Sequence, residues 1–403
     1  MSAAADGSDR GVGTGSLLLV TAAITGWATA ITMIGPLLVD LSRELDVPLG
    51  QLGLLGAAMS LPWALGAPFT GLLSDRLGRR PLMVLALCGV GAASIAAAFA
   101  TNFATLMAAR FVAGLFGAFG PASTMAAIGD LVPPQRRGSA MGWLNLGFGL
   151  AAVAGVPAVG IVAGLFGWRW AFATTGLVLF VLAVLVQTGF PNSGAGSGGA
   201  SLRATYSAVL GTSHLGNVLS ANLLERGIFN AAVLYLPSFL MLTYGLGPAE
   251  VAPALAVVAV GTIGGNTAGG WLGDRLPKAA IFVGAQTVAG LIGLALFGLT
   301  PGLFISVVAG GLFGLANAAS RPAFLALGSE LSPRYRGALL GLLSLTNQGG
   351  AVLGSALGGL ALGLGSYAAL AGLTMACGLT AALLALPLAR RTTPRSQPRS
   401  APG

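Results

Sequence analysis

Charged side chains are scarce in this chain of 403 residues. Lysine and arginine number 20 and aspartate and glutamate 11, so that charged residues make up 8% of the chain, against roughly 25% in an average soluble protein. So few charges could not cover the surface of a soluble protein of this size, which excludes a soluble enzyme. Hydrophobic residues make up 55% and recur in long stretches from Leu17 to Leu388, a pattern typical of an integral membrane protein.

Residues that bind metals or form disulfides are also few. The chain has one histidine and two cysteines, Cys88 and Cys377, which lie in separate apolar runs. The sequence therefore predicts no metal cluster and no disulfide framework. No ATP-binding motif is present, and we expect no cofactor. The apolar run after the small, polar first sixteen residues is of spanning length, which predicts a retained first span rather than a cleaved signal peptide.

Charges, prolines and glycine clusters divide the apolar sequence into segments long enough to cross a bilayer as helices. The expected spans are 17–39, 50–73, 82–100, 103–129, 139–165, 168–189, 214–241, 249–272, 279–299, 302–328, 337–364 and 366–388. We predict an all-α membrane protein with twelve transmembrane helices in two pseudo-symmetric six-helix bundles. Its expected parts are an N-terminal tail (1–16), a first bundle (17–189), a Gly- and Ser-rich linker (190–213), a second bundle (214–388) and a basic tail (389–403).

The two halves repeat one another in sequence. The run Gly-Leu-Phe-Gly at 114–117 recurs at 311–314, and the pattern Gly-x-x-x-Asp-Arg at 71–76 recurs at 270–275. Parallel repeats of six helices are one architecture of secondary transporters. The repeats therefore indicate a transporter built by duplication.

Cations are unevenly divided between alternate loops. With the N-terminus in the cytoplasm, fifteen arginines and lysines fall on the cytoplasmic side and only Arg43 and Arg169 fall outside. Since positive loops favour the cytoplasm, the sequence predicts a multi-pass protein of the cell (inner, cytoplasmic) membrane with both termini cytoplasmic. We expect the basic tail to lie beside anionic lipid rather than to bind nucleic acid.

The loop after the second expected span reads Gly71-x-x-x-Asp75-Arg76-x-Gly78-Arg79-Arg80-Pro81. This loop resembles the signature between helices 2 and 3 of the major facilitator superfamily, and the resemblance covers the whole chain. In that family the loop is understood as a conformational latch, in which arginines can pair with carboxylates at nearby helix ends. The resemblance implies gating roles for Asp75, Arg76, Gly78, Arg79, Arg80, Asp130, Asp274, Arg275 and Glu330. The alternative is that these charges only set the topology.

Two further motifs resemble the twelve-helix drug:proton antiporter group of this superfamily. The pattern Leu106-x-x-x-Arg110-x-x-x-Gly114-x-x-x-Ala118 places Arg110 deep in the fourth span, where a cation costs about 2.5 kcal/mol or more. The resemblance implies a role for Arg110 in proton transfer; the alternative is a tether to backbone carbonyls of helix 1 or 2. In the fifth span, the resemblance implies a kinked, closely packed hinge at Gly155, Pro157 and Gly160.

Three more membrane charges lie in the second half. Glu225 is the only carboxylate well inside an expected span, which makes it the candidate for carrying the coupling proton. The competing interpretation is an ion pair with Arg226 or Arg321 that only holds the bundle together. Asn222, Arg226 and Asn230 follow one another at i, i+4 spacing and so share a helix face, as in a cavity wall.

Polar and aromatic residues on several spans are candidates for binding a substrate. The predicted substrate-binding residues are Trp27, Asn222, Arg226, Asn230, Asn317, Arg321 and Asn347. Inside the membrane, three arginines face one glutamate. This surplus favours an anionic or strongly dipolar substrate, unless Asp130 and Glu330 neutralise it from the helix ends.

Taken together, these features predict a secondary active transporter, not an enzyme, working by alternating access. We expect proton-coupled efflux of small amphipathic compounds. The alternative is a transporter of small organic anions, by uptake or export, that uses Arg226 and Arg321 as anion ligands. The expected partners are a small-molecule substrate, protons and membrane lipid, with no nucleic acid, and we expect a monomer. The short tails disfavour a third class, a membrane sensor or scaffold.

Overall fold

The computed structural model describes residues 14–191, 211, 214–331 and 336–389. Its first half consists of α1 (Thr14–Thr32), η1 (Gly35–Leu37), α2 (Leu38–Leu45), α3 (Leu49–Leu52), α4 (Leu54–Leu77), α5 (Arg79–Ala98), α6 (Phe103–Gly117), α7 (Gly120–Leu131), η2 (Pro134–Arg136), α8 (Arg137–Leu150), the π-helical turn η3 (Ala151–Gly155), α9 (Val156–Phe166) and α10 (Trp168–Gly189). Its second half consists of α12 (Leu215–Tyr244), α13 (Pro248–Gly273), α14 (Lys278–Leu299), α15 (Leu303–Leu331), α16 (Arg336–Gly363) and α17 (Tyr367–Ala389).

Most of these helices are long and apolar enough to cross a membrane. Among the described residues eleven such segments occur, six in the first half and five in the second. The remaining long helix of the second half, α16, has 28 residues. The described elements contain helices and no strand, which confirms the predicted helical membrane fold with two halves. The expected tails 1–16 and 389–403 and the expected linker 190–213 lie largely outside the described residues.

Most helix boundaries agree closely with the expected spans, and the sixth, α10, agrees at both ends. The second span continues to Leu77 instead of ending at residue 73, so that Asp75 and Arg76 lie in α4 and not in the loop after it. The first span differs: it continues through η1 and α2 to Leu45 instead of ending at residue 39. Pro36 lies in η1 and has no N–H to donate to a preceding carbonyl, so that the chain passes through a tight turn and then resumes an α-helix. As a result Arg43, expected in an outer loop, lies in the last turn of α2.

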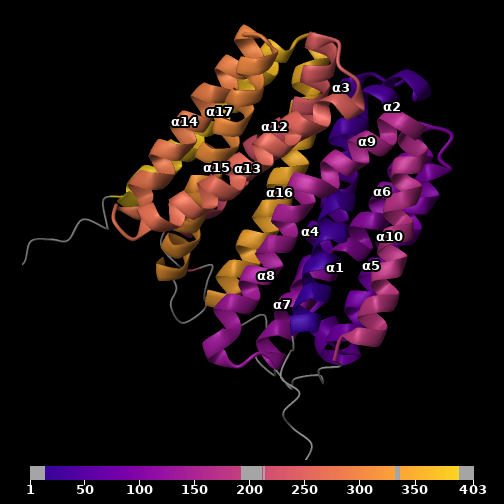
Figure 1. Cartoon of the computed structure of the whole chain (residues 1–403). Coiled ribbons are helices and arrows are strands. Elements are labelled where there is room, and N and C mark those ends of the chain that lie inside the picture. Colours follow the sequence, from indigo (N-terminus) through magenta and orange to yellow (C-terminus); the bar gives the residue numbers. More distant parts are fainter. Residues whose placement is uncertain (1–13, 192–210, 212–213, 332–335, 390–403) are drawn as a thin grey trace, which may run out of the picture.

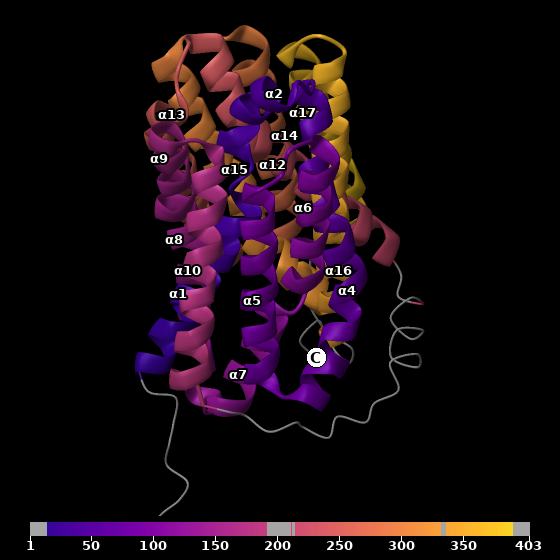
Figure 2. The ribbon, with the colours of Figure 1, turned by 90° about the vertical axis from the view of Figure 1, so that its right-hand side faces the viewer.

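The two halves form two neighbouring bundles, the first coloured indigo to magenta and the second pink through orange to yellow in Figures 1 and 2. Close contacts between them gather at one end, shown at the top of Figure 1. Gly50 of α3 lies against the Gly359 backbone of α16, and a Cβ on Gly160 of α9 would come within 2.9 Å of the Pro248 carbonyl oxygen in α13. The largest buried apolar cluster also crosses between the halves here, joining η1 to α12. This closed end lies opposite the end where α4 passes into α5.

Candidate functional site

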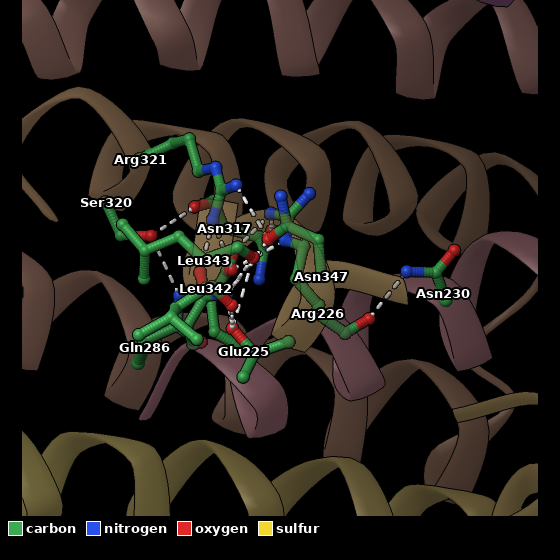
Figure 3. Close-up of polar contacts among 12 residues, drawn as sticks. Glu225, Arg226, Asn230, Gln286, Asn317, Ser320, Arg321, Leu342, Leu343 and Asn347 are labelled. Carbon is green, nitrogen blue, oxygen red and sulfur yellow. Dashed lines mark hydrogen bonds and ion pairs between the residues drawn. The ribbon is translucent and has the colours of Figure 1, made fainter. Parts of the chain in front are cut away.

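A buried charge cluster lies inside the second half, where α12, α15 and α16 meet (Figure 3). The Glu225 side chain is only 1% exposed and forms ion pairs with two arginines. Arg226 donates from Nε to Glu225 Oε2 at 2.6 Å and also pairs through its NH2 group. Arg321 approaches the same oxygen at 3.3 Å. The structure therefore contains the ion pairs that the sequence left as an alternative role for Glu225, and the proton-coupling role stays a prediction.

Asparagine side chains fix the position of Arg321. Its guanidinium donates to Asn222 Oδ1 at 2.7 Å and to Asn347 Oδ1 at 2.8 Å. Asn222 in turn donates to Asn347 at 3.0 Å, and Asn317 accepts a longer bond of 3.4 Å from Arg226. Asn222 and Asn317 are fully buried. Five of the predicted substrate-binding residues thus come together, but the hydrogen bonds of Arg321 are directed to the protein itself.

Arg226, unlike Arg321, lines a cavity between the two halves. This cavity has a volume of about 330 Å³ and is enclosed by α1, η3, α12 and α13 among others. Its walls are largely apolar, with Phe148, Val156 and Phe229 among the lining residues. The Arg226 guanidinium lies over the Phe229 ring, 4.9 Å from its centroid. One cationic residue therefore lines an otherwise uncharged and largely apolar space, and that same residue contacts Glu225.

Two predicted substrate-binding residues lie apart from the cluster. Asn230 donates to the Arg226 backbone carbonyl at 2.8 Å and lines a smaller cavity. Trp27 is 2% exposed and packs edge to face against Trp63, with ring centroids 4.6 Å apart. Trp27 therefore belongs to the apolar core of the first half. It is not among the residues that line the cavity beside Arg226, called the larger cavity below.

Arg110 is buried in the first half and contacts the end of α1. Its two terminal nitrogens donate to the carbonyl oxygens of Ala30 and Ile31, at 2.9 and 3.0 Å. The last carbonyls of a helix have no partner within that helix, so the guanidinium satisfies groups that the break before η1 would leave unpaired. This geometry is the tether that the sequence left as an alternative. A proton-transfer role for Arg110 stays a prediction.

The predicted hinge residues Gly155, Pro157 and Gly160 lie at the end of η3 and in α9, which pack closely against α1 on one side and α13 on the other. Pro157 follows the π-helical turn η3, as expected where a missing N–H interrupts the hydrogen-bond pattern. A Cβ on Gly155 would overlap the Thr29 hydroxyl of α1, and Gly160 lies against Pro248 of the other half. The π-helical turn and the close packing are present, and a kink or movement at this position stays a prediction.

Gly155→Ala is expected to lower the stability of the protein, because its methyl group overlaps Thr29 Oγ1. Overpacking of this kind costs about 1–3 kcal/mol. Thermal unfolding of the purified variant measures the loss. The double variant Gly155→Ala/Thr29→Ala should recover part of it, since removal of the hydroxyl makes room. Unchanged stability in the single variant would contradict the close contact.

The predicted latch residues form a network at the end opposite the closed contacts. Arg79 donates to Asp130 at 2.8 Å and to Ser74 at 2.8 Å, linking α5 to α7 and α4. Gly78 has a φ of 90°, a conformation that glycine adopts without strain, and it lets α4 turn directly into α5. Arg80 donates to the Phe190 carbonyl after α10 at 3.3 Å. Pairing between the loop arginines and the end of the fourth span is therefore present.

Other predicted latch residues add less to this network. Arg76 is exposed, and in the second half the Arg275 guanidinium lies 3.6 Å from the centroid of the Trp271 ring. Asp274 caps the end of α13. The side chains of Asp75 and Glu330 lie outside the described residues. Gating by any of these residues stays a prediction.

Asp130→Asn is expected to change transport more than stability. The Asp130 side chain is 39% exposed, and ion pairs near the surface contribute about 1 kcal/mol or less. If the ion pair between Asp130 and Arg79 stabilises one conformation of the transporter, loss of this pair should change the initial transport rate at least twofold. The thermal stability of the protein should change little. Both are measured on the same preparation. An unchanged rate would leave the pair with a purely structural role.

Sequence reasoning missed two contributors to the charge cluster. Thr346 accepts a hydrogen bond from Asn222 at 2.6 Å. Gln286 of α14 is fully buried and donates to Ser320 at 2.9 Å. A lone amide in the apolar run 279–299 was the available signal for Gln286.

The fold and the buried site define a secondary-transporter architecture. The model of the Major Facilitator Superfamily matches residues 18–300 and 218–403, and the chain belongs to this family. It is 29% identical over 296 residues to the "Chloramphenicol resistance protein" of Streptomyces lividans, covering 72% of this chain and 75% of that protein. It is 28% identical over 349 residues to the "Inner membrane transport protein YdhP" of Escherichia coli, covering 86% and 87%.

A solved structure has the same fold. The bacterial homologue of the human lysosomal transporter Spinster, described as inward-facing and unoccupied, matches with a TM-score of 0.78 at 19% identity, over 93% of this chain and 96% of that chain. The family and the fold that the sequence predicted are thereby confirmed.

Proposed function

We propose that this transporter exports small amphipathic compounds from the cytoplasm by alternating access, and that Glu225 carries the proton whose inward movement drives export. The observation that carries this proposal is the position of Arg226. Arg226 lines the largely apolar cavity between the halves, and its guanidinium is ion-paired with buried Glu225. A change of protonation at Glu225 therefore acts directly on the one charged group at the cavity.

The chemistry of the cavity suits an amphipathic compound. A volume of about 330 Å³ is within the range of small-ligand pockets, which are mostly apolar with a few polar groups that set orientation. Aromatic or aliphatic parts of a substrate would contact Phe148 and Phe229, while a hydrogen-bond acceptor would face Arg226. The names of two relatives support this reading: the chloramphenicol resistance protein already described, and the "Multi-drug resistance efflux pump PmrA" of Streptococcus pneumoniae, 35% identical over 133 residues, a third of each chain.

The charge cluster supplies a coupling mechanism. Arg321 is held by two asparagines, so it remains in place whatever the state of Glu225. A proton on Glu225 would remove the countercharge of both arginines and leave two cations close together in a low-dielectric site, which is costly. Movement of Arg226 relieves that repulsion. We infer that this movement links protonation to the relative position of the halves.

The orientation of the chain completes the proposal. With both termini cytoplasmic, the closed contacts of Gly50 and Gly160 lie on the outer side of the membrane. The cavity would then receive substrate from the cytoplasm, as export requires. The latch around Arg79 and Asp130 would lie on the cytoplasmic side and bias the same alternation.

Transport of small organic anions is the second candidate. The observation that favours it is the excess of cationic charge in the cluster, with Arg226 and Arg321 against Glu225. Arg226 is the residue placed to contact an anion in the cavity. Arg321 would hold Arg226 in position through the Glu225 carboxylate that both arginines contact.

Accumulation in inside-out membrane vesicles tests the two candidates. Chloramphenicol and an aromatic carboxylate of similar size serve as probes, with an imposed pH gradient, acidic inside. Export of amphipathic compounds predicts gradient-driven accumulation of chloramphenicol at several times the level of vesicles without the protein. Accumulation of the carboxylate alone would favour the anion transporter and overturn the drug-export proposal.

A further inference from the structure

A second cavity lies beside Arg110 and is built from both halves of the transporter. It has a volume of about 50 Å³, and its lining includes Arg110 and Ser60 from the first half and Asn230 and Ser355 from the second. Thr32 lines both this space and the larger cavity, so the two adjoin. Five of its eleven lining residues have polar side chains, namely Thr32, Ser60, Arg110, Asn230 and Ser355.

The charge of Arg110 has no countercharge in the described part of the chain. Its side chain is 2% exposed, and Nε is buried without a hydrogen-bond partner. The two contacts it makes are to neutral carbonyls, and no described carboxylate forms an ion pair with it. The single carboxylate of α12, Glu225, is already shared by two arginines. A buried cation in a membrane protein pairs with carboxylates or with backbone carbonyls, and among the described residues Arg110 has only carbonyls as partners.

Hydrogen-bond donors converge on the same space. Among the described residues, the hydroxyl groups of Ser60 and Ser355 make no hydrogen bond within the protein, and each side chain is largely buried beside the cavity. Asn230 uses one amide hydrogen on the Arg226 carbonyl and has a second to donate. An anion is bound well by hydroxyl and amide donors that lie beside a guanidinium cation.

We propose that this cavity binds one small monovalent anion, held by Arg110 and Ser60 of the first half and by Asn230 and Ser355 of the second. A cavity of roughly 10–15 Å³ holds one water molecule, so about 50 Å³ accommodates a chloride-sized ion but not a drug-sized molecule. The anion is either a free inorganic ion or a carboxylate group on a bound compound.

Binding at this position favours the conformation described here. The ligands come from both halves next to the closed contacts, so the complete site exists only while these surfaces are together. An anion that binds one state shifts the population toward that state. The site therefore makes the alternation sensitive to small anions, a property beyond the proposed export of amphipathic compounds.

Thermal unfolding of the purified full-length protein tests the proposal without any transport assay. Sodium isethionate, whose anion carries no carboxylate, is replaced stepwise by sodium chloride, and separately by sodium acetate, at constant ionic strength. We expect a saturable rise in the unfolding temperature. A rise with chloride alone identifies a free inorganic ion, and a rise with acetate assigns the site to a carboxylate. No saturable rise with either salt overturns the proposal.

Variants locate the effect. Ser60→Ala/Ser355→Ala keeps Arg110 and its tether to α1, and should raise the half-saturating anion concentration at least tenfold. Ser123→Ala is the matched control, because Ser123 is a buried serine without a hydrogen-bond partner that does not line this cavity. It should titrate like the parent. A double variant that also titrates like the parent places any anion effect elsewhere and overturns the site.

Discussion

Glu225→Gln is expected to abolish accumulation driven by a pH gradient, reducing it at least tenfold toward the level of vesicles without protein. Glutamine keeps the size and much of the hydrogen bonding of glutamate, but its amide cannot bind and release the coupling proton. Substrate binding should persist, because Glu225 is 1% exposed and does not line the larger cavity. Exchange of labelled for unlabelled substrate without a gradient should persist as well.

The same substitution should destabilise the protein. Removing one partner of a buried ion pair costs about 3–5 kcal/mol because the remaining charge stays buried, and here two arginines lose their countercharge. Thermal unfolding must therefore be measured on the same preparation. Glu250→Gln is the matched control, since Glu250 is an exposed carboxylate at the start of α13. If Glu225→Gln couples protons as well as the parent, coupling lies elsewhere, and the next candidates are the carboxylates of Asp40 in the first turn of α2 and Asp130 in α7.

Arg226→Ala and Arg321→Ala are expected to separate substrate binding from stability. Arg226 lines the cavity, so its loss should weaken chloramphenicol binding at least tenfold, about 1.4 kcal/mol. Arg321 is held by Asn222, Asn347 and Glu225, so its loss should reduce stability by about 3 kcal/mol or more. Calorimetric binding and thermal unfolding of both variants make the comparison.

The lysine variants sharpen this comparison. Lysine has no planar fork with which to bond two asparagines at once, so Arg321→Lys should recover only part of the stability lost in Arg321→Ala. Arg226→Lys keeps a cation at the cavity and should recover more of the binding. The opposite pattern, with binding lost in a stable Arg321→Ala protein, would make Arg321 the substrate ligand.

Local sequence patterns determined most of the fold. The spans follow from runs of apolar residues between charges and prolines, and such runs alone decide which segments can cross a bilayer. The error in the first span has a local cause: the expected span ended at residue 39, before the charged residues Asp40 and Arg43, but the helix resumes after the short turn at Pro36 and carries both charges in α2. A proline signals an interruption, and it does not tell whether the helix resumes beyond it.

The candidate site was less accessible to sequence reasoning. Spacing along α12 placed Asn222 and Arg226 on one face, and both belong to the charge cluster. Spacing within one helix cannot tell which of two arginines reaches a cavity, because that depends on neighbouring helices. Arg226 reaches it and Arg321 is enclosed by amides. The burial of Trp27 against Trp63 likewise depends on contacts between two spans.

Proton flux that depends on substrate tests the central proposal most directly. Proteoliposomes with an internal pH-sensitive dye receive a chloramphenicol gradient and no imposed pH gradient. Antiport through the cavity predicts proton movement opposite to the movement of chloramphenicol, at a rate reduced at least tenfold by Glu225→Gln and unaffected by Glu250→Gln. Transport of chloramphenicol with no proton movement, or with protons moving in the same direction, would contradict proton-driven export.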